Sequence, residues 1–463
     1  MPEPARQPAS ARDKQSQRSQ RNSAETPRGT QRERLVRAMI ELSAEVGYQG
    51  VTVAQVSSLA GVSSATFYEL FEGKEDCLLA AYQTVSAQLF SRVRRSASGE
   101  RRSHVVRATL AAVLTGVQGD PNAGRLMFVE GLAGGPRVRT ELARVLESFE
   151  TRAEARLDDA TDDADTLDIP AIALVGAVRS IVARHLRTHS EDLLPSLLDD
   201  MIAWVQSYAV PSGQARWSTG PRAHLALAPG PDPSERPSVP ERLPRGRHGL
   251  PASAVARSQR TRIINGIAEV MLSKGYANAT VSDIVTAAGV AREAFYQHFS
   301  DKQHAFLEAQ QFPTQYILDT CVSAYFAEEQ WPDRVWNGLK ALLGLIADNP
   351  AQAHLRLVEC YAAGPAAARR AEEITRSFTI FLEEGYRYRP EARTLPRLCS
   401  QTIAGALFEV IQRTVARGQT TELPRYLPLL AYLAIAPFTG PQAAVQLLED
   451  ARARAERTTS SPA

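Results

Sequence analysis

Apolar residues recur at spacings of three and four positions along most of this chain, which is the period of an amphipathic helix. Leu35, Met39 and Leu42 follow this spacing up to Gly47, and glycine commonly ends a helix. The same arrangement returns ahead of Gly275. No stretch alternates apolar and polar residues for long enough to predict a strand, so we expect an all-α protein. Further helices are predicted over residues 74–95, 103–118, 137–158, 168–187 and 191–209, with counterparts later in the chain.

The chain repeats itself at a nearly constant offset. The stretch GVSSATFYELFEGKEDCLLAAY at 61–82 returns as GVAREAFYQHFSDKQHAFLEAQ at 289–310, which is 228 positions later. Farther on, DPNAGRLMFVEGLAGGP at 120–136 parallels NPAQAHLRLVECYAAGP at 349–365, now 229 positions apart. A register that slips by one residue over about 175 positions indicates that a whole domain was duplicated.

Each copy opens with the signals of two short helices joined by a tight turn. Thr52 stands where an N-cap belongs, and Leu59 falls on the stripe that the first short helix is expected to bury. Gly61 supplies the turn, and Ser63 caps a second short helix that runs to about Glu69. Two short helices joined in this way make a helix-turn-helix, whose second helix enters the DNA major groove.

This frame resembles the DNA-binding domain of TetR-family transcriptional regulators. In the first copy the resemblance lies in Thr52, Val56, Ala60-Gly61-Val62-Ser63, Thr66-Phe67-Tyr68, Phe71, Lys74 and Leu78. In the second copy it lies in Thr280, Ile284, Ala288-Gly289-Val290, Phe295-Tyr296, Phe299 and Lys302. Each half also has the length of a family member and an all-helical C-terminal portion.

The resemblance implies two tandem all-α units, each a three-helix helix-turn-helix DNA-binding domain followed by a helical ligand-binding and dimerisation domain. The two units are separated by a Pro- and Gly-rich stretch that is not expected to form a helix or a strand. We expect a disordered basic arm at 1–28, DNA-binding domains at 29–75 and 253–303, helical C-terminal domains at 76–210 and 304–440, a linker at 211–252 and a C-terminal tail at 441–463.

Residues that would hold the protein on the DNA backbone follow from the resemblance. The expected phosphate contacts are Thr52, Tyr68, Lys74, Thr280, Tyr296 and Lys302. A phenol can donate to phosphate, and a lysine at a helix start lies beside free amides that also favour an anion. Such contacts set the register without reading sequence. Packing of the tyrosines, solvation of the lysines and helix capping by the threonines remain alternative explanations.

Base reading falls to exposed side chains of the second short helix, where the two copies differ. The candidate readers are Ser63, Ser64 and Thr66 in the first copy and Arg292, Glu293, Gln297 and His298 in the second. Arg can fork onto guanine and Gln onto adenine, whereas Ser and Thr discriminate less. We therefore expect two different half-sites and an asymmetric double-stranded DNA operator.

Two departures bear on whether the second domain binds DNA. Ala294, expected on the exposed face of its helix, replaces Thr66, and Val285 replaces Ser57 where the family usually has a small Ala. The alternative function is a ligand sensor or protein-interaction module in which the second DNA-binding domain is degenerate.

TetR-like regulators ordinarily dimerise through their last two long helices, and the resemblance extends this expectation to both halves. The corresponding pairs are 170–187 with 191–209 and 398–418 with 422–437, where Gly176 aligns with Gly405. Either the halves pair within one chain as a pseudo-dimer, or two chains form a homodimer. The resemblance also implies a small-molecule effector that loosens DNA binding. Candidate pocket residues are Phe128, Glu130, Arg179, Trp336, Tyr361 and Phe408.

Composition narrows the remaining possibilities. The 463 residues are 44% apolar and 22% charged, with a net charge of +2, and no apolar run approaches the roughly 18 residues of a membrane span. No secretory signal opens the chain and the four cysteines are scattered, so we expect a cytoplasmic protein without membrane partners. His185 and His189 lack a metalloprotease signature, and no phosphate loop or nucleophile with a partner is evident. We expect no enzyme, no catalytic residue, no cofactor and no metal.

Overall fold

The computed structural model describes residues 30–96, 101–159, 165–211, 251–312 and 314–459. The arm predicted at 1–28 and almost all of the linker predicted at 211–252 lie outside the described residues. We call residues 30–211 the first unit and residues 251–459 the second unit. Within the described residues, no helix is long and apolar enough to span a membrane.

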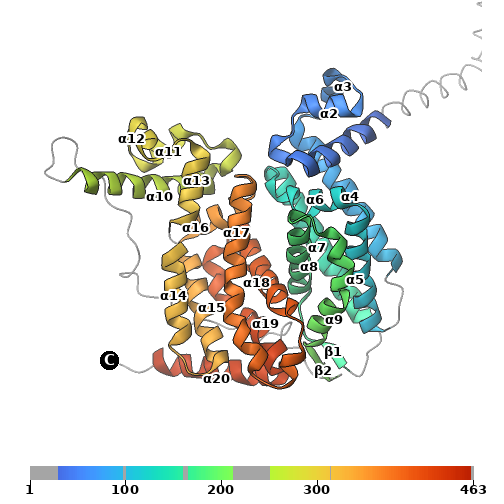
Figure 1. Ribbon diagram of the computed structural model, residues 1–463, viewed down its shortest axis with the longest axis vertical. Coiled ribbons are helices and arrows are strands. Elements are labelled where there is room, and N and C mark those ends of the chain that lie inside the picture. Colours follow the sequence, from blue (N-terminus) through green and yellow to red (C-terminus); the bar gives the residue numbers. More distant parts are fainter. Residues whose placement is uncertain (1–29, 97–100, 160–164, 212–250, 313, 460–463) are drawn as a thin grey trace, which may run out of the picture.

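The first unit is a helix-turn-helix domain on top of a helical body (Figure 1). It opens with a helix over residues 30–46. The elements that follow are η1 (Tyr48–Gly50), α2 (Val53–Ala60), α3 (Ser64–Leu70), α4 (Lys74–Ser96), α5 (Arg102–Gly119), α6 (Pro121–Phe128), η2 (Glu130–Ala133), α7 (Pro136–Asp159), β1 (Asp165–Leu167), α8 (Ala171–Arg187), η3 (Glu191–Leu197), α9 (Leu198–Gln206) and β2 (Ala209–Pro211).

The second unit has the same succession of a helix-turn-helix domain and a helical body, but its helices are divided differently and it contains no strand among the described residues. Its first helix, α10 (Ala252–Asn278), is kinked at Gly275, whose φ of 71° lies in the left-handed region that glycine tolerates. The elements that follow are α11 (Val281–Ala288), α12 (Arg292–His298), α13 (Lys302–Gln311), α14 (Thr314–Phe326), α15 (Trp331–Asp348), α16 (Pro350–His354), η6 (Leu355–Glu359), α17 (Pro365–Ser377), η7 (Phe378–Arg387), η8 (Glu391–Thr394), α18 (Leu398–Ala416), η9 (Thr420–Tyr426), α19 (Leu427–Thr439) and α20 (Pro441–Thr459).

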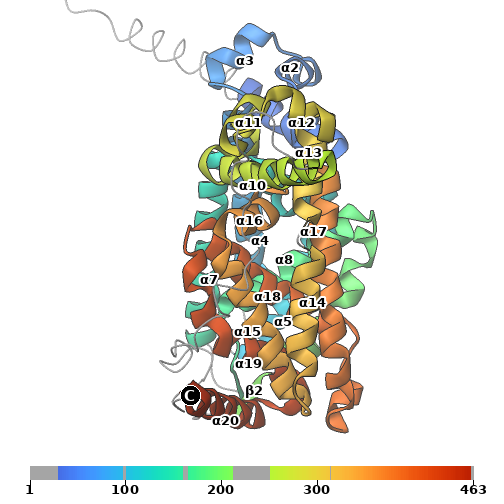
Figure 2. The ribbon, with the colours of Figure 1, turned by 90° about the vertical axis from the view of Figure 1, so that its left-hand side faces the viewer.

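The two units lie side by side with both helix-turn-helix domains at the same end of the molecule (Figures 1 and 2). Helices α8 and α18 pack against each other at the seam. Gly176 of α8 lies against Glu409, and Gly405 of α18 lies against Ser180, so closely that a side chain on either glycine would overlap its neighbour. Because these positions correspond in the two halves, the seam has approximate two-fold symmetry.

The all-α prediction is confirmed, with three local differences. Two three-residue strands, β1 and β2, pair antiparallel at the far end of the first body. Leu59, expected on the buried stripe of its helix, is 52% exposed. The predicted C-terminal tail was wrong: residues 441–459 form α20, which packs on α15 and α19 through buried Ala444 and Leu448. That helix is held by tertiary burial of a few apolar side chains among polar ones.

Candidate DNA interface

The first helix-turn-helix is built by local capping. Thr52 Oγ1 accepts from the amide of Gln55 at 3.3 Å, and Gln55 Oε1 accepts from the amide of Thr52 at 2.9 Å, which forms a capping box. Gly61, with a φ of 63°, ends α2 in the left-handed region. Ser63 then caps α3, since its hydroxyl accepts from the amide of Thr66 at 3.0 Å. The chain therefore turns steeply into α3 at a defined angle.

The second helix-turn-helix has the same capping box, but a carboxylate takes the place of the glutamine and also pairs with a lysine. Asp283 accepts from the Thr280 amide at 3.0 Å and from Lys274 Nζ at 2.6 Å, while Thr280 Oγ1 accepts from the Asp283 amide at 3.2 Å. The hydrogen bond from Lys274 and those from Thr280 lower the pKa of Asp283 to about 2. One cap is missing: Ala291 precedes α12 without a side-chain hydrogen bond, where the first copy has Ser63.

An exposed tyrosine lies on the second short helix of each helix-turn-helix domain. Tyr68 is 61% exposed and Tyr296 is 49% exposed, although each follows a phenylalanine that is fully buried. Phe67 and Phe295 anchor α3 and α12 from below, which leaves the adjacent phenols directed outwards. Arg292 lies 5.7 Å from the centre of the Tyr296 ring, so its charge is beside that phenol. This geometry suits donors to phosphate.

The two lysines expected on phosphate have bonds inside their own domains. Lys74 Nζ donates to the carbonyl oxygens of Tyr48 at 3.1 Å and Val51 at 3.0 Å. Lys302 Nζ donates in the same way to the carbonyl oxygens of Tyr276 at 2.7 Å and Ala279 at 2.9 Å. Burial lowers the pKa of both ammonium groups. These bonds brace the loop ahead of α2 or α11, and contact with phosphate stays a prediction.

The candidate base readers differ in how far they face outwards. Ser63 and Ser64 are exposed in the first domain, and Thr66 is half-buried with its hydroxyl 2.9 Å from that of Ser63. Because the hydroxyl of Thr66 already has Ser63 as a hydrogen-bond partner, the Thr66 side chain is held within the domain. The first reader helix is therefore small and polar, with little reach.

In the second domain Arg292, Glu293 and Gln297 are exposed. His298 is half-buried, its Nε2 atom is buried without a hydrogen bond, and burial followed by the nearby charge of Arg260 lowers its pKa. The expectation that Ala294 lies on the exposed face is wrong, because the side chain is buried beneath α12. Long side chains on the outer face make this reader chemically unlike the first.

One glutamate in each unit joins the DNA-binding domain to the body, and sequence reasoning missed this role. Glu130 Oε2 accepts from the Tyr48 amide at 2.8 Å, and Glu359 Oε2 accepts from the Tyr276 amide at 2.7 Å. Burial would raise the pKa of Glu359, but His354, Arg139 and the Tyr276 amide lower it. The available signal was the dipeptide Val-Glu, which recurs at the 229-residue offset.

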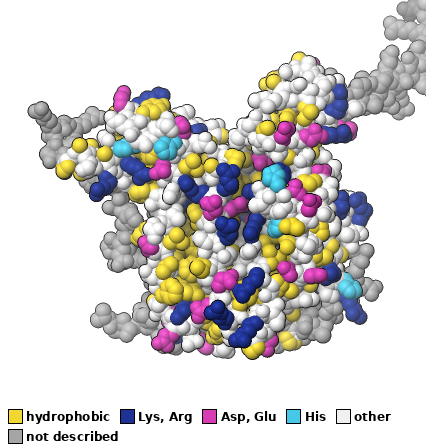
Figure 3. Space-filling view, viewed as in Figure 1, with side chains coloured by type: hydrophobic (Ala, Val, Ile, Leu, Met, Phe, Trp, Pro, Cys, Tyr) yellow, Lys and Arg dark blue, Asp and Glu magenta, His cyan; other side chains and the backbone are white. Residues whose placement is uncertain are grey.

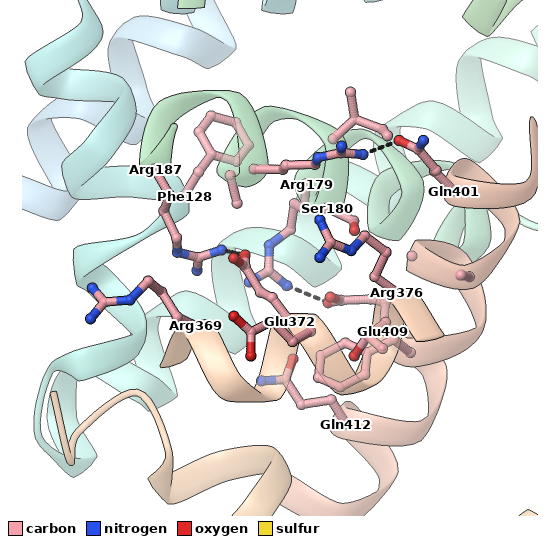
Figure 4. A pocket seen from close by; sticks show the side chains of 18 of the residues that line it. Phe128, Arg179, Ser180, Arg187, Arg369, Glu372, Arg376, Gln401, Glu409 and Gln412 are labelled. Atoms are coloured by element: carbon pink, nitrogen blue, oxygen red, sulfur yellow. Dashed lines mark hydrogen bonds and ion pairs between the residues drawn. The ribbon is translucent and has the colours of Figure 1, made fainter. Parts of the chain in front are cut away.

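Some expected pocket residues meet in a cavity of about 260 Å³ at the seam between the units (Figure 4). Phe128, Arg179, Tyr361 and Phe408 line it, whereas Trp336 is buried in the apolar core. The cavity walls also carry guanidinium groups and carboxylates from both units, namely Arg184, Arg187, Arg369, Arg376, Glu372, Glu373 and Glu409. Figure 3 shows Lys and Arg side chains gathered at the middle of this face, where the units meet.

Comparison with known proteins identifies the helix-turn-helix domains. The family described as Bacterial regulatory proteins, tetR family, matches residues 35–81 and again residues 263–309. Each match covers a helix-turn-helix and the start of the helix after it. No curated protein matches the chain.

Several solved structures are similar to the chain. The fatty acid degradation regulator FadR from Bacillus halodurans is 16% identical, with a TM-score of 0.34, and covers 38% of this chain and 94% of that one. FadR from Bacillus subtilis, solved in complex with stearoyl-CoA, is 17% identical with a TM-score of 0.34, and the match covers 40% of this chain and 99% of that one. A transcriptional regulator from Rhodococcus sp. Rha1 is 22% identical with a TM-score of 0.34, and the match covers 39% of this chain and 99% of that one.

The two family matches agree with the capped helices, the left-handed glycine turns and the buried phenylalanines found in both halves. This chain therefore carries two domains of the tetR family of bacterial regulatory proteins in tandem, one at the head of each all-α unit, which supports a DNA-binding transcriptional regulator.

Proposed function

We propose that the chain is a sequence-specific repressor whose two different readers act together as an intrachain pseudo-dimer on an asymmetric operator, and that a small-molecule effector releases it. In this proposal Tyr68 and Tyr296 bind phosphate. Ser64 reads bases through the first domain, and Arg292 and Gln297 read them through the second. The exposed outer faces of α3 and α12 support this assignment.

The buried ion pair between Arg179 of α8 and Glu409 of α18 is the observation that carries the pseudo-dimer. Both side chains are nearly inaccessible, and a buried charge without its partner is strongly unfavourable. The alignment of the halves places Ser180 at the position of Glu409, so a seam made of two α8 helices would supply no carboxylate to Arg179. Charge complementarity therefore favours pairing of unlike halves.

Further charges cross the seam in the same sense. Arg413 of α18 lies 2.6 Å from Glu150 of the first unit, and Arg139 of the first unit lies 3.5 Å from Glu359 of the second. Like pairing would lose these contacts too. Since the two readers are then fixed at one end of one chain, they would act on neighbouring grooves without a second molecule.

Light scattering tests the assembly. The pseudo-dimer predicts a particle near the chain mass of 50.5 kDa in the absence of DNA, whereas a homodimer would have about twice that mass. Selection of bound sequences from a random DNA pool tests the readers, and we expect two unlike half-sites. A clean palindrome would contradict the proposal.

The uncapped start of α12 and the inward-facing His298 favour one alternative, a degenerate second reader in a ligand-sensing protein. Replacing Arg292 and Gln297 by Ala separates the two. In the proposal the change relaxes specificity at one half-site by about 1–3 kcal/mol for each lost base contact. If selected sequences and affinities stay the same, the second domain does not read DNA.

A further inference from the structure

The body of the second unit encloses an apolar cavity of about 290 Å³. Helices α14, α15 and α18 and the η7 segment supply most of its wall, with Ile317, Leu342, Ile346, Phe381, Leu407 and Ile411 among the lining residues. Phe312 and Tyr316 also line it and are exposed, so they mark the mouth of the cavity. Figure 3 shows hydrophobic side chains gathered on the face over α14. The volume is close to the lower end of the range for small-molecule sites.

Arg356 is the one charged side chain among the described residues that line this cavity. Its Nη2 atom lies 3.5 Å from the carbonyl oxygen of Ala309, its Nε atom is buried without a partner, and no carboxylate within the described part of the chain lies in ion-pair range. Burial lowers the pKa of Arg356 to about 10, so the group stays charged at neutral pH. An unpaired buried charge costs stability unless something else compensates it.

Other polar groups near Arg356 also lack partners. Both side-chain atoms Oε1 and Nε2 of Gln352 are buried and unbonded, and so is Oε1 of Gln310. Gln310, Gln352 and Asn265 line the same cavity as Arg356. Buried polar groups are nearly always satisfied in folded proteins, so a cluster of open ones beside an unpaired cation points to a missing polar partner.

The first unit does not share this anchor. At the 229-residue offset the position of Arg356 is occupied by Met127, which is buried in the first core at 5% exposure. Gln352 corresponds to Ala123, which is also buried. The duplication therefore left the polar group in one unit and an apolar side chain in the other.

We propose that the second unit alone binds an amphipathic carboxylic acid, with its carboxylate on Arg356 and Gln352 and its hydrocarbon body in the apolar cavity. The inference rests on the proposed function, in that this acid would be the effector. A volume of 290 Å³ holds on the order of ten groups the size of a water molecule, at about 30 Å³ each, which indicates a medium-length chain.

The site is placed where a ligand would affect DNA binding. Arg356 lies in η6, a single π-helical turn, three residues before Glu359, which accepts from the Tyr276 amide. Thr261 and Asn265 of α10, the first helix of the second DNA-binding domain, line the same cavity. A carboxylate bound here would contact both the body and a helix that carries the reader.

Calorimetric titration of the full-length protein with decanoate, decanol and decylamine tests the ligand class. We expect decanoate to bind at least tenfold more tightly than decanol, and decylamine to bind more weakly still, because only the acid brings a negative charge and two acceptor oxygens to the arginine. Arg356→Gln should weaken decanoate at least tenfold and leave decanol unchanged, and Arg356→Lys should restore part of the difference. The matched control is Arg425→Gln, at an exposed arginine outside the cavity.

A second measurement guards against a folding defect. Because Arg356→Gln removes a half-buried charge that has no carboxylate partner among the described residues, the ligand-free variant should melt at the same temperature as the wild-type protein or higher. A markedly lower melting temperature, equal affinity for decanoate and decanol, or an Arg356→Gln variant that keeps its decanoate affinity would overturn the inference. If decanoate binds through Arg356 but leaves operator binding unchanged, the ligand class stands and the effector role in the proposed function fails.

Discussion

The buried pair Arg179–Glu409 makes an unequal prediction for its two ends. Glu409 has two cationic partners, because it accepts from Arg413 Nε at 3.0 Å as well as pairing with Arg179. Among the described residues, Arg179 has an ion pair with Glu409 alone. Arg413 in turn keeps Glu150 at 2.6 Å. Glu409→Met therefore strands Arg179 in the seam, while Arg179→Met leaves Glu409 with a cationic partner.

The burial of the two groups sets the magnitude. The side chain of Arg179 is 10% exposed and that of Glu409 is 5% exposed, so solvent screens neither charge well. Burial alone would lower the pKa of Arg179, but the charge of Glu409, the nearby Tyr82 and Tyr361 and the hydrogen bond to Glu409 together raise it. We expect Glu409→Met to lower the free energy of unfolding by about 3–5 kcal/mol, the usual cost of breaking a buried pair from one side. Arg179→Met should cost about 2 kcal/mol, the size of one charged hydrogen bond.

Urea denaturation followed by far-ultraviolet circular dichroism measures both variants and the double variant. The double variant should be more stable than Glu409→Met, because replacing both members of a buried pair by apolar groups removes the stranded charge. Arg417→Met serves as the control: this arginine is half exposed and 3.5 Å from Glu147 across the same seam, and its loss should cost less than about 1 kcal/mol. A larger loss for Arg179→Met than for Glu409→Met would refute the reasoning.

Three further predictions concern packing, capping and DNA contact. Gly405→Val should lower the free energy of unfolding by about 1–3 kcal/mol in thermal denaturation, since the seam has no room for a side chain there, whereas Gly119→Ala has open space around it and serves as its control. Tyr68→Phe should leave the melting temperature unchanged but weaken binding to all DNA sequences in a fluorescence anisotropy titration, because the exposed phenol is expected to contact only phosphate. The capping contribution of Asp283 is complete above pH 3.8 and is lost as the pH falls through about 2, so amide exchange at the start of α11 should rise in that window while Gln55 keeps α2 capped.

The sequence contained enough information to predict both helix-turn-helix domains. Their determinants act over a few residues: a threonine at an N-cap, a glycine in a left-handed turn, and a phenylalanine on the buried side of a seven-residue helix. Short-range signals of this kind depend little on the rest of the molecule, so periodicity and residue type were sufficient. The same holds for the duplication, which a constant offset reveals directly.

What the sequence left open depends on contacts between distant residues. Arg179 and Glu409 are 230 positions apart, and nothing near either residue announces a pair. Lys74 has the position of a phosphate-binding lysine, yet its nearest acceptors are carbonyl groups that only the folded loop brings to it. Residues 441–459, predicted as a tail, form α20 because the body of the second unit has an apolar surface on which this helix packs.

Arg356 shows the same division. In the sequence it is one arginine among many and aligns with a methionine, so its type and spacing carry no signal. The tertiary structure surrounds it with an apolar wall and leaves its charge without a carboxylate among the described residues. The sequence by itself determined most of the helices, the caps of the short helices and the two DNA-binding domains, because those follow from local hydrogen bonding. Which unit pairs with which, and which unit has a charged cavity, was decided by burial and charge across the whole fold, where free energies depend on neighbours that the linear order does not place together.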